Sequence, residues 1–458
     1  MAQQRLGRRH LRSDGAPPGP RGTNGTARFV GWLGSLGCAA AGYAVFQFLF
    51  SVLPGSLGGE AARYLISGVS GVGTAAAAWL AAALARARAT AVPLPPAPDR
   101  SASPAPGPLP EVFAAAYDAL VDQVSVVDDP AHGRLVGWSH ALGENPPSRP
   151  TPLGTAYGLH IMLDLGIPDG RLGTGDLVET LWRLRLPDGG WSARSQGAQA
   201  RPEITALVLG ALARAGASGP RLAAEVEHCT ARFTRQLDRA GRDSTHVVTT
   251  VLRGLLRAAP RCDILPRLRD ALVAGAVSDP RREHLRCWGY RLDMPYGLPS
   301  SVHTAQAVVA LGRAARVLGE PAAARAARED GIRWLLACPD TAHHHCRDLK
   351  NLREEVRRPR TDDPSRHEVL NVRHFTAAWL VRALMSPGAR ETAARDGLEE
   401  AWRERLDGAA AAVWAGQADG LWSWGRAESN GLRHPLWMTY QGLSALRAHA
   451  VWMYRPLD

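Results

Sequence analysis

Residues 185–216 read RLPDGGWSARSQGAQARPEITALVLGALARAG, a glycine and tryptophan loop followed by a helix that starts near Thr205. This helix is apolar nearly all round in its first two turns, which is typical of a helix buried on both sides. Gly189 and Gly190 permit a tight turn, after which the indole of Trp191 can pack over the end of a neighbouring helix. The stretch therefore predicts a buried helix with a tryptophan at its entry.

The same kind of helix start recurs along the chain, and self-similarity of this kind indicates a repeat architecture. The six copies are headed by Thr155, Thr205, Thr249, Thr304, Thr376 and Thr439. Charged amphipathic segments, typical of surface helices, alternate with them at 111–124, 176–186, 221–237, 265–277, 322–338 and 391–414. We therefore expect an all-α fold, an (α/α)6 toroid of six parallel inner helices and six outer helices. An open solenoid of helix pairs is the alternative.

A tryptophan loop precedes four of the six helix starts. The tryptophans are Trp138, Trp191, Trp288 and Trp422. We interpret them as structural packing residues, with a ligand platform formed by residues such as Trp191 and Trp422 as the alternative.

Two of these loops carry a family resemblance. QADGLW at 417–422 and the degenerate RLPDGGW at 185–191 resemble the QW repeats of the squalene and terpenoid cyclase and protein prenyltransferase superfamily. PEITA at 202–206 resembles the helix starts of the same superfamily. The resemblance covers residues 111–455 and implies the toroid, but it does not select an activity.

The resemblance also directs attention to Glu203. In squalene-cyclase-like enzymes the corresponding helix begins D-x-D-D-T-A and its middle aspartate protonates the polyene, whereas residues 201–206 read RPEITA. A helix N-terminus and the nearby Arg201 both favour the ionised carboxylate, which cannot donate a proton. Glu203 is the candidate catalytic acid, with helix capping or an ion pair as the alternative. We therefore predict a binding toroid without full cyclase chemistry, and a terpene cyclase-like, isoprenoid-processing enzyme as the alternative.

No metal or other cofactor is predicted. His303 matches the zinc-ligand histidine that the resemblance to prenyltransferases implies, but the matching Asp-x-Cys pair is not apparent, and one imidazole does not hold zinc. The run His343–Cys346 offers adjacent ligands that point in divergent directions, so we interpret it as part of a loop. This loop belongs to a long connection, 339–374, which is either solvated or a lid over the ring.

Parallel inner helices direct their free N–H groups and positive dipole ends toward one mouth. The ligand-binding candidates at this mouth, besides Glu203, are His303, His374, His434, Trp437 and Tyr440. A polar, aromatic mouth above an apolar lining suits an isoprenoid phosphate, a lipid or a peptide tail. A carbohydrate-active (α/α)6 enzyme is a further alternative, and it needs a pair of carboxylates such as Glu203 with Glu144 or Asp293.

The N-terminal region predicts a membrane anchor. Uncharged stretches at 29–53 and 64–84 are long enough to span a bilayer as a helical hairpin, residues 29–88 in all. The flanking arginines place both ends in the cytoplasm, with a signal peptide or a surface second helix as alternatives. We expect a disordered basic cytoplasmic tail at 1–28, a proline-rich linker at 89–110 and the toroid at 111–458, on the cytoplasmic side of a bacterial cell membrane.

The charge and cysteine content exclude other classes. The formal net charge is +11, but residues 1–110 carry ten arginines against three acids, so the rest of the chain is close to neutral. We therefore expect the lipid bilayer as a partner and no nucleic acid. The six cysteines show no C-x-x-C spacing, which indicates free thiols in a reducing compartment.

Overall fold

The structure, a computed structural model, describes Thr74 and residues 109–144, 146–166, 170–193, 199–292, 298–338, 341, 353–359, 367–373, 375–423 and 433–453. The chain divides into two compact units, Met1–Ser103 and Pro104–Asp458. Apart from Thr74, the predicted spans at 29–53 and 64–84 lie outside the described residues, as does the tail at 1–28. No helix among the described residues is long and apolar enough to cross a membrane.

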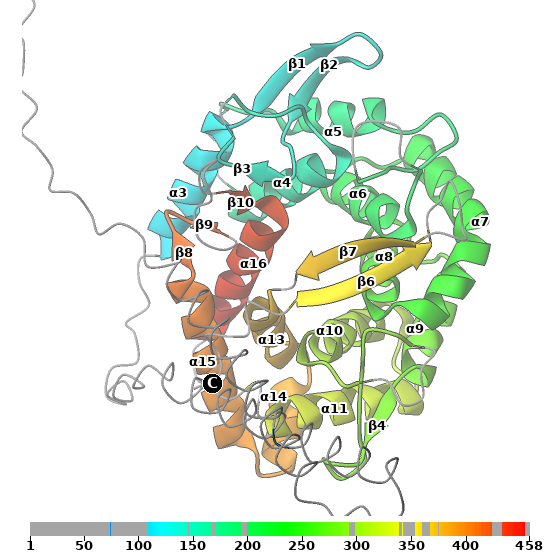
Figure 1. Ribbon diagram of the computed structural model, residues 1–458, viewed down its shortest axis with the longest axis vertical. Helices are drawn as coiled ribbons and strands as arrows, with labels where there is room; N and C mark the ends of the chain where they lie inside the picture. The colour runs from blue at the N-terminus through cyan, green and yellow to red at the C-terminus, as the bar shows by residue number, and fades with distance from the viewer. Residues whose placement is uncertain are drawn as a thin grey trace, which may run out of the picture. The chain divides into compact units, whose positions relative to one another are not determined.

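The second unit is mostly helical, and its fold is toroid-like. Six helices contain the repeated threonines: α4 (Pro152–Leu165), α6 (Pro202–Arg214), α8 (Thr245–Ala258), α10 (Ser301–Leu318), α13 (Thr376–Leu384) and α16 (Leu436–Met453). Each of them packs against the next, and α16 packs against α4, so they form a closed inner ring (Figure 1). All six threonines are buried. The closed ring overturns the open solenoid.

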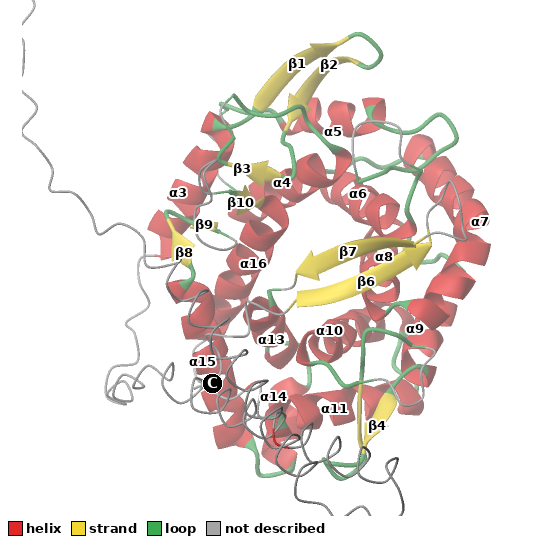
Figure 2. Cartoon of the chain, in the orientation of Figure 1, coloured by secondary structure: helices red, strands yellow, loops and turns green. Residues whose placement is uncertain are grey.

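The amphipathic helices lie outside this ring (Figure 2). They are α3 (Leu109–Asp122), α5 (Thr174–Arg183), α7 (Pro220–Asp243), α9 (Ile264–Ala274), α11 (Ala322–Ala337) and α15 (Glu399–Ala415), with the short α14 (Ala389–Arg395) before α15. The single helix predicted at 391–414 is therefore wrong. Gly397 breaks it, because its φ of 69° belongs to the left-handed region that favours glycine.

Contacts at both ends show that inner helices run in the same direction. At the start of α8, the amide of Thr245 donates to the carbonyl of Tyr290, which lies in the tryptophan loop that leads into α10. Directly before α16, His434 pairs in a short two-stranded sheet with Leu142, which lies in the connection that leads into α4. At the opposite end, α4 receives ion pairs from the late residues of both α6 and α16. The starts of these helices therefore share one end of the ring and their C-termini share the other.

The structure contains small β-sheets, although the sequence predicts an all-α fold. The described residues contain five antiparallel pairs: β1 (Ser125–Asp129) with β2 (Gly133–Gly137), β3 (Ala141–Leu142) with β10 (His434–Pro435), β4 (Val277–Asp279) with β5 (Leu285–Cys287), β6 (Arg353–Pro359) with β7 (His367–Arg373), and β8 (Gln417–Ala418) with β9 (Leu421–Trp422). Three of these hairpins lead from an outer helix into a tryptophan loop. Strands of two to five residues are too short to show a reliable alternating pattern.

The tryptophan loops fasten outer helices to inner ones. The indole Nε1 atoms of Trp138, Trp191, Trp288 and Trp422 donate to carbonyls at the end of the preceding outer helix, at Leu120, Leu181, Leu272 and Val413. The amides of Trp138, Trp191 and Trp288 in turn donate to the hydroxyls of Thr155, Thr205 and Thr304. The prediction that these indoles pack over a neighbouring helix is confirmed.

Part of the long connection 339–374 forms the β6–β7 hairpin. Strand β7 ends at Arg373, directly before α13, so the hairpin joins the ring at the end where the inner helices start. In the view of Figure 1 it crosses the projection of the inner ring. The described part of this connection is therefore an ordered hairpin rather than an irregular loop.

Candidate functional site

A large cavity opens at the C-terminal ends of the inner helices. Its volume is about 1560 Å³, and its walls come from the later turns of α4, α8, α10, α13 and α16, from Tyr440 near the start of α16, and from the outer helices α14 and α15. A smaller cavity of about 40 Å³ lies deeper in the ring, and the two share Arg257, Arg313, Arg382 and Tyr440 as lining residues. The centre of the ring is thus accessible from the end opposite to the predicted mouth.

Arginines dominate the walls of the large cavity. Its described lining contains seven of them against two acids, Asp164 and Glu391. The arginines are Arg257, Arg313, Arg316, Arg382, Arg390, Arg403 and Arg447, and Arg253 lines the smaller cavity. Guanidinium groups in a partly dry cavity attract carboxylates and phosphates, which they bind with paired hydrogen bonds. The lining therefore favours an anion.

The charge of Asp164 is already shared. Its carboxylate pairs with Arg214 of α6, and Arg447 of α16 lies 3.1 Å from the same oxygen. These two ion pairs fix the ends of α4, α6 and α16 to one another. Asp164 also acts on Arg382, but its carboxylate is shared among several arginines of the cavity.

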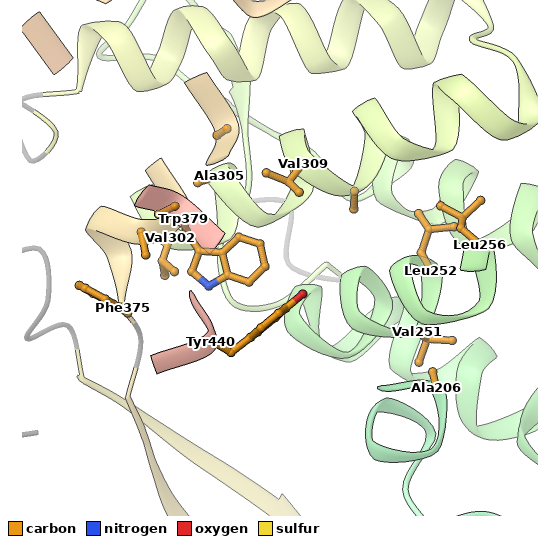
Figure 3. Packing of buried hydrophobic residues seen from close by; sticks show 14 of the residues in the cluster. Ala206, Val251, Leu252, Leu256, Val302, Ala305, Val309, Phe375, Trp379 and Tyr440 are labelled. Carbon is orange, nitrogen blue, oxygen red and sulfur yellow. The ribbon is translucent and has the colours of Figure 1, made fainter. Parts of the chain in front are cut away.

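Trp379 of α13 holds two of the central arginines. The guanidinium carbon of Arg382 lies 4.3 Å from the centroid of the indole, and that of Arg253 lies 4.6 Å away. Cation–π attraction of this kind positions a guanidinium without removing its charge. Figure 3 shows Trp379 and Tyr440 close together inside the ring.

An aromatic stack lies beside these arginines. The ring of His160 stacks on that of Tyr440, with 5.3 Å between the ring centroids. The ring of Tyr157 also contacts Tyr440, in a tilted arrangement with 5.6 Å between the centroids. All three residues line the smaller cavity. They offer flat apolar surface next to the cationic groups, which suits a ligand with an anionic group and an apolar body.

Several polar atoms of this region are buried without a hydrogen-bond partner. They include Arg382 Nη1, Trp379 Nε1, His160 Nδ1 and Gln441 Oε1, all on residues that are at most 8% exposed. Buried polar groups are normally paired, because an unpaired one costs about 1–3 kcal/mol. All four residues line the smaller cavity, so polar groups there are available to a bound molecule.

Burial and mutual repulsion act on the ionisation of the cluster. Burial, aided by the neighbouring Arg382, lowers the pKa of Arg253 to about 9. Burial and then the charges of Arg382 and Arg257 also lower the pKa of Arg313. Burial, followed by the nearby arginines, holds the pKa of His160 well below 6.5, so His160 is neutral at physiological pH. The neighbouring positive charges repel one another, so a negatively charged group is favoured in the cavity.

Of the predicted site residues, the structure places only Tyr440 in this cavity. Glu203 is buried in the first turn of α6 and lines neither cavity. His303, in the first turn of α10, is buried, with its Nδ1 atom 3.0 Å from the Ser300 hydroxyl. His434 and Trp437 lie at the start of α16, away from both linings. His374 lies outside the described residues.

Trp191 and Trp422 are fully buried, and neither lines a cavity. An indole with no exposed surface cannot stack on a ligand, so the structure gives both residues the packing role. The lining also differs from the predicted apolar one, because arginines enter it from α8, α10 and α13.

The carboxylate pairs considered for a carbohydrate enzyme do not meet in the described cavity. Glu144 pairs with Arg433 at 3.5 Å and lines a separate small pocket. Asp293 and the run His343–Cys346 lie outside the described residues. Among the residues that the structure does describe, no group of three or more His, Cys, Asp or Glu side chains is arranged to hold a metal ion.

The arginines of the cavity are not among the residues predicted from the sequence, although they stand in the aligned segments. Arg214 and Arg313 follow their threonines by nine positions, and Arg257 and Arg447 follow theirs by eight. The available signal was an arginine that recurs eight or nine positions after the threonine in otherwise apolar helices. It pointed to a ring of arginines at the C-terminal end.

Comparisons with known proteins add little. No protein-family model matches the chain, and no curated protein matches it. Among solved structures, the chain is similar to a sugar epimerase from a ruminal bacterium, with 12% identity and a TM-score of 0.45. The match covers 76% of this chain and 99% of the epimerase. A likeness at this level assigns no activity.

Proposed function

We propose that this chain is an (α/α)6 toroid that binds an amphipathic ligand with an anionic head group in its central cavity. The observation that carries the proposal is the excess of arginines over acids around a cavity of about 1560 Å³. The apolar walls at Val309, Leu384 and Met385 would contact the body of the ligand. An isoprenoid phosphate, an anionic lipid or an acidic peptide tail meets these requirements.

The same charges argue against polyene cyclisation. Cyclisation of a polyene passes through carbocations, and nearby guanidinium groups repel a carbocation in a medium of low dielectric constant. Glu203, the candidate acid, also lies outside both cavities. These two points favour binding over terpene cyclase-like chemistry with Glu203 as the acid.

A two-pass anchor at 29–53 and 64–84 is part of the same proposal. It would hold the toroid on the cytoplasmic side of a bacterial membrane, where a lipid-borne ligand is available. The support is the length of the two uncharged stretches and the flanking arginines.

A carbohydrate-active toroid is the second candidate. The observation in its favour is the stack of Tyr157, His160 and Tyr440 beside Arg253 and Arg382, since aromatic faces and guanidinium groups together suit an acidic sugar.

The test is a binding comparison on the detergent-purified full chain. We expect farnesyl diphosphate to bind at least about tenfold more tightly than farnesol, a difference of ~1.4 kcal/mol. Arg313→Gln and Arg382→Gln should each weaken diphosphate binding by at least about tenfold. Arg325→Gln, on an exposed side chain outside the cavity, is the matched control and should change nothing.

Three other outcomes would redirect the proposal. Equal affinity for the alcohol and the diphosphate would contradict an anion site. Preferential binding of an acidic oligosaccharide would favour the second candidate. A cyclised product from squalene that disappears in Glu203→Gln would establish the cyclase alternative.

A further inference from the structure

Tyr440 occupies the centre of the arginine cluster. It is the fifth residue of α16, it is 7% exposed, and it lines both cavities. In Figure 3 its hydroxyl points away from α16, toward the helix that carries Leu252 and Leu256. As a lining residue of both cavities, Tyr440 can contact a group bound there.

Charged and titratable side chains face Tyr440 from every inner helix that packs against this region. From α4 come Tyr157, His160 and Asp164, from α6 Arg214, from α8 His246, Arg253 and Arg257, from α10 Arg313 and Arg316, from α13 Arg382, from α16 itself Arg447, and from the outer helices α14 and α15 Arg390, Glu391 and Arg403. Asp164 is bound by Arg214 and Arg447, and Glu391 is the other acid of the described lining, so the phenol of Tyr440 is a third group that can supply negative charge to the arginines.

Two neighbouring tyrosines show the effect of these charges. Burial raises the pKa of Tyr157 to about 12 and keeps this residue neutral. Burial acts in the same direction on Tyr440, but Arg257, Arg382 and Arg313 together outweigh it and lower the pKa of Tyr440 to about 8. Neighbouring titratable groups with very different pKa values are typical of acid–base sites.

We propose that Tyr440 is the proton-exchanging residue of the ligand site. Above about pH 8 it is a phenolate that balances the arginines of the free protein, and as a neutral phenol it donates a hydrogen bond to the anionic group of the ligand. When the ligand enters, the Tyr440 oxygen takes up a proton from water, and no covalent bond of the ligand forms or breaks. This inference rests on the proposed function, because it requires an anion in the cavity.

Linkage gives the sign of the pH dependence. The bound anion favours the phenol over the phenolate, so ligand binding raises the pKa of Tyr440 above its value of about 8. Affinity should therefore be highest below pH 8 and should fall above it, by at most about tenfold per pH unit for a single linked proton.

Inorganic sulfate is the probe, because it has no proton of its own to exchange in this pH range. We would titrate the detergent-purified full chain with sulfate by calorimetry in buffers of different ionisation enthalpy, which gives the number of protons taken up. The wild type should take up about half a proton per sulfate at pH 8, where Tyr440 is half ionised and Arg253, with a pKa of about 9, is still mostly protonated. Tyr440→Phe should take up much less and should still bind sulfate through the arginines.

Tyr117→Phe is the matched control. Tyr117 is a buried tyrosine of α3 that lines neither cavity, so its removal should leave the proton uptake unchanged. A second measurement needs no variant: phenolate absorbance of the wild type should show one tyrosine titrating near pH 8, and sulfate should move that transition to higher pH.

The outcomes separate the two proposals. If the wild type does not bind sulfate, the anion site itself is wrong. If sulfate binds but proton uptake is equal in the wild type and Tyr440→Phe, or the tyrosine titration does not move, only the role of Tyr440 is overturned.

Discussion

The guanidinium carbon of Arg382 lies 4.3 Å from the centroid of the Trp379 ring, and both side chains are buried. The indole holds this arginine against the cavity, yet it supplies no negative charge. The Nη1 atom of Arg382 has no hydrogen-bond partner, and burial lowers the pKa of the guanidinium. The proposed anion site therefore includes an arginine whose burial costs the free protein stability.

Replacing Arg382 by methionine should separate the two effects. Methionine fills a similar space and removes an unpaired buried charge, a change that often stabilises a protein by about 1–4 kcal/mol. We expect a higher melting temperature together with weaker sulfate binding. Arg325→Met, at an exposed ion pair, should leave both unchanged. A melting temperature lowered by the Arg382 variant would show that its contact with Trp379 contributes more than its burial costs.

The bond between Trp288 and Thr304 predicts a loss of stability. The Trp288 amide donates to the Thr304 hydroxyl at 3.0 Å, and both residues are completely buried. Thr304→Val keeps the shape but leaves the amide unpaired, which should lower the free energy of unfolding by about 1–3 kcal/mol. Denaturant unfolding measures the change.

Thr304→Ser is the control for this variant. Serine keeps the acceptor and loses a methyl group, so it should cost less than valine, at about 1 kcal/mol. Valine and serine variants of equal stability would mean that the hydroxyl of Thr304 contributes little to joining loop and helix.

Much of the ring could be predicted because its signals are local and repeated. Each inner helix has its threonine near its start, and the threonine is buried in all six. The tryptophan loops follow from the same repeat, since each indole reaches a carbonyl of the outer helix just before it. Such contacts join neighbours in sequence, so the sequence pattern is sufficient to find them.

The site was harder to predict because it depends on long-range orientation. Arg257, Arg313 and Arg382 come from three different repeats and meet only when the ring closes. In sequence, an arginine in the later turns of an apolar helix is indistinguishable from one that extends to solvent. The helix N-termini offered a general anion-binding argument, and it directed attention to the end of the ring opposite to the described cavity.

Two glycines of the inner helices lie directly against the tryptophan rings, so replacing either by a larger residue should cause a steric clash. A methyl group added at Gly158 of α4 would overlap the ring of Trp138, and one at Gly442 of α16 would overlap Trp422. Both indoles are fully packed, so neither can move aside. Gly158→Ala and Gly442→Ala should each destabilise the protein by roughly 1–3 kcal/mol or more.

Gly175 is the matched control within a helix. Nothing lies within 4 Å of a methyl group added there, in the outer helix α5. Gly175→Ala should therefore stabilise the protein by about 0.5–1 kcal/mol through helix propensity alone. A Gly158→Ala variant as stable as Gly175→Ala would contradict the close packing of Trp138 on α4. Thermal melting of the three variants is sufficient to decide.

His160 predicts how stability depends on acid. Its side chain is 1% exposed, and burial together with the nearby arginines holds its pKa well below 6.5 in the folded protein. Unfolding frees the imidazole to take a proton, so the contribution of neutral His160 is complete above pH 6.5 and is lost as the pH falls below it. The loss has a maximum slope of about 1.4 kcal/mol per pH unit.

His160→Phe keeps an aromatic ring against Tyr440 and removes the titration, so its free energy of unfolding should fall less between pH 6.5 and about pH 5 than that of the wild type. His284→Asn, at an exposed histidine, should follow the wild type over the same range. Parallel pH profiles for His160→Phe and the wild type would show that His160 accepts a proton within the folded ring, and that the arginines around it repel charge less than their positions imply.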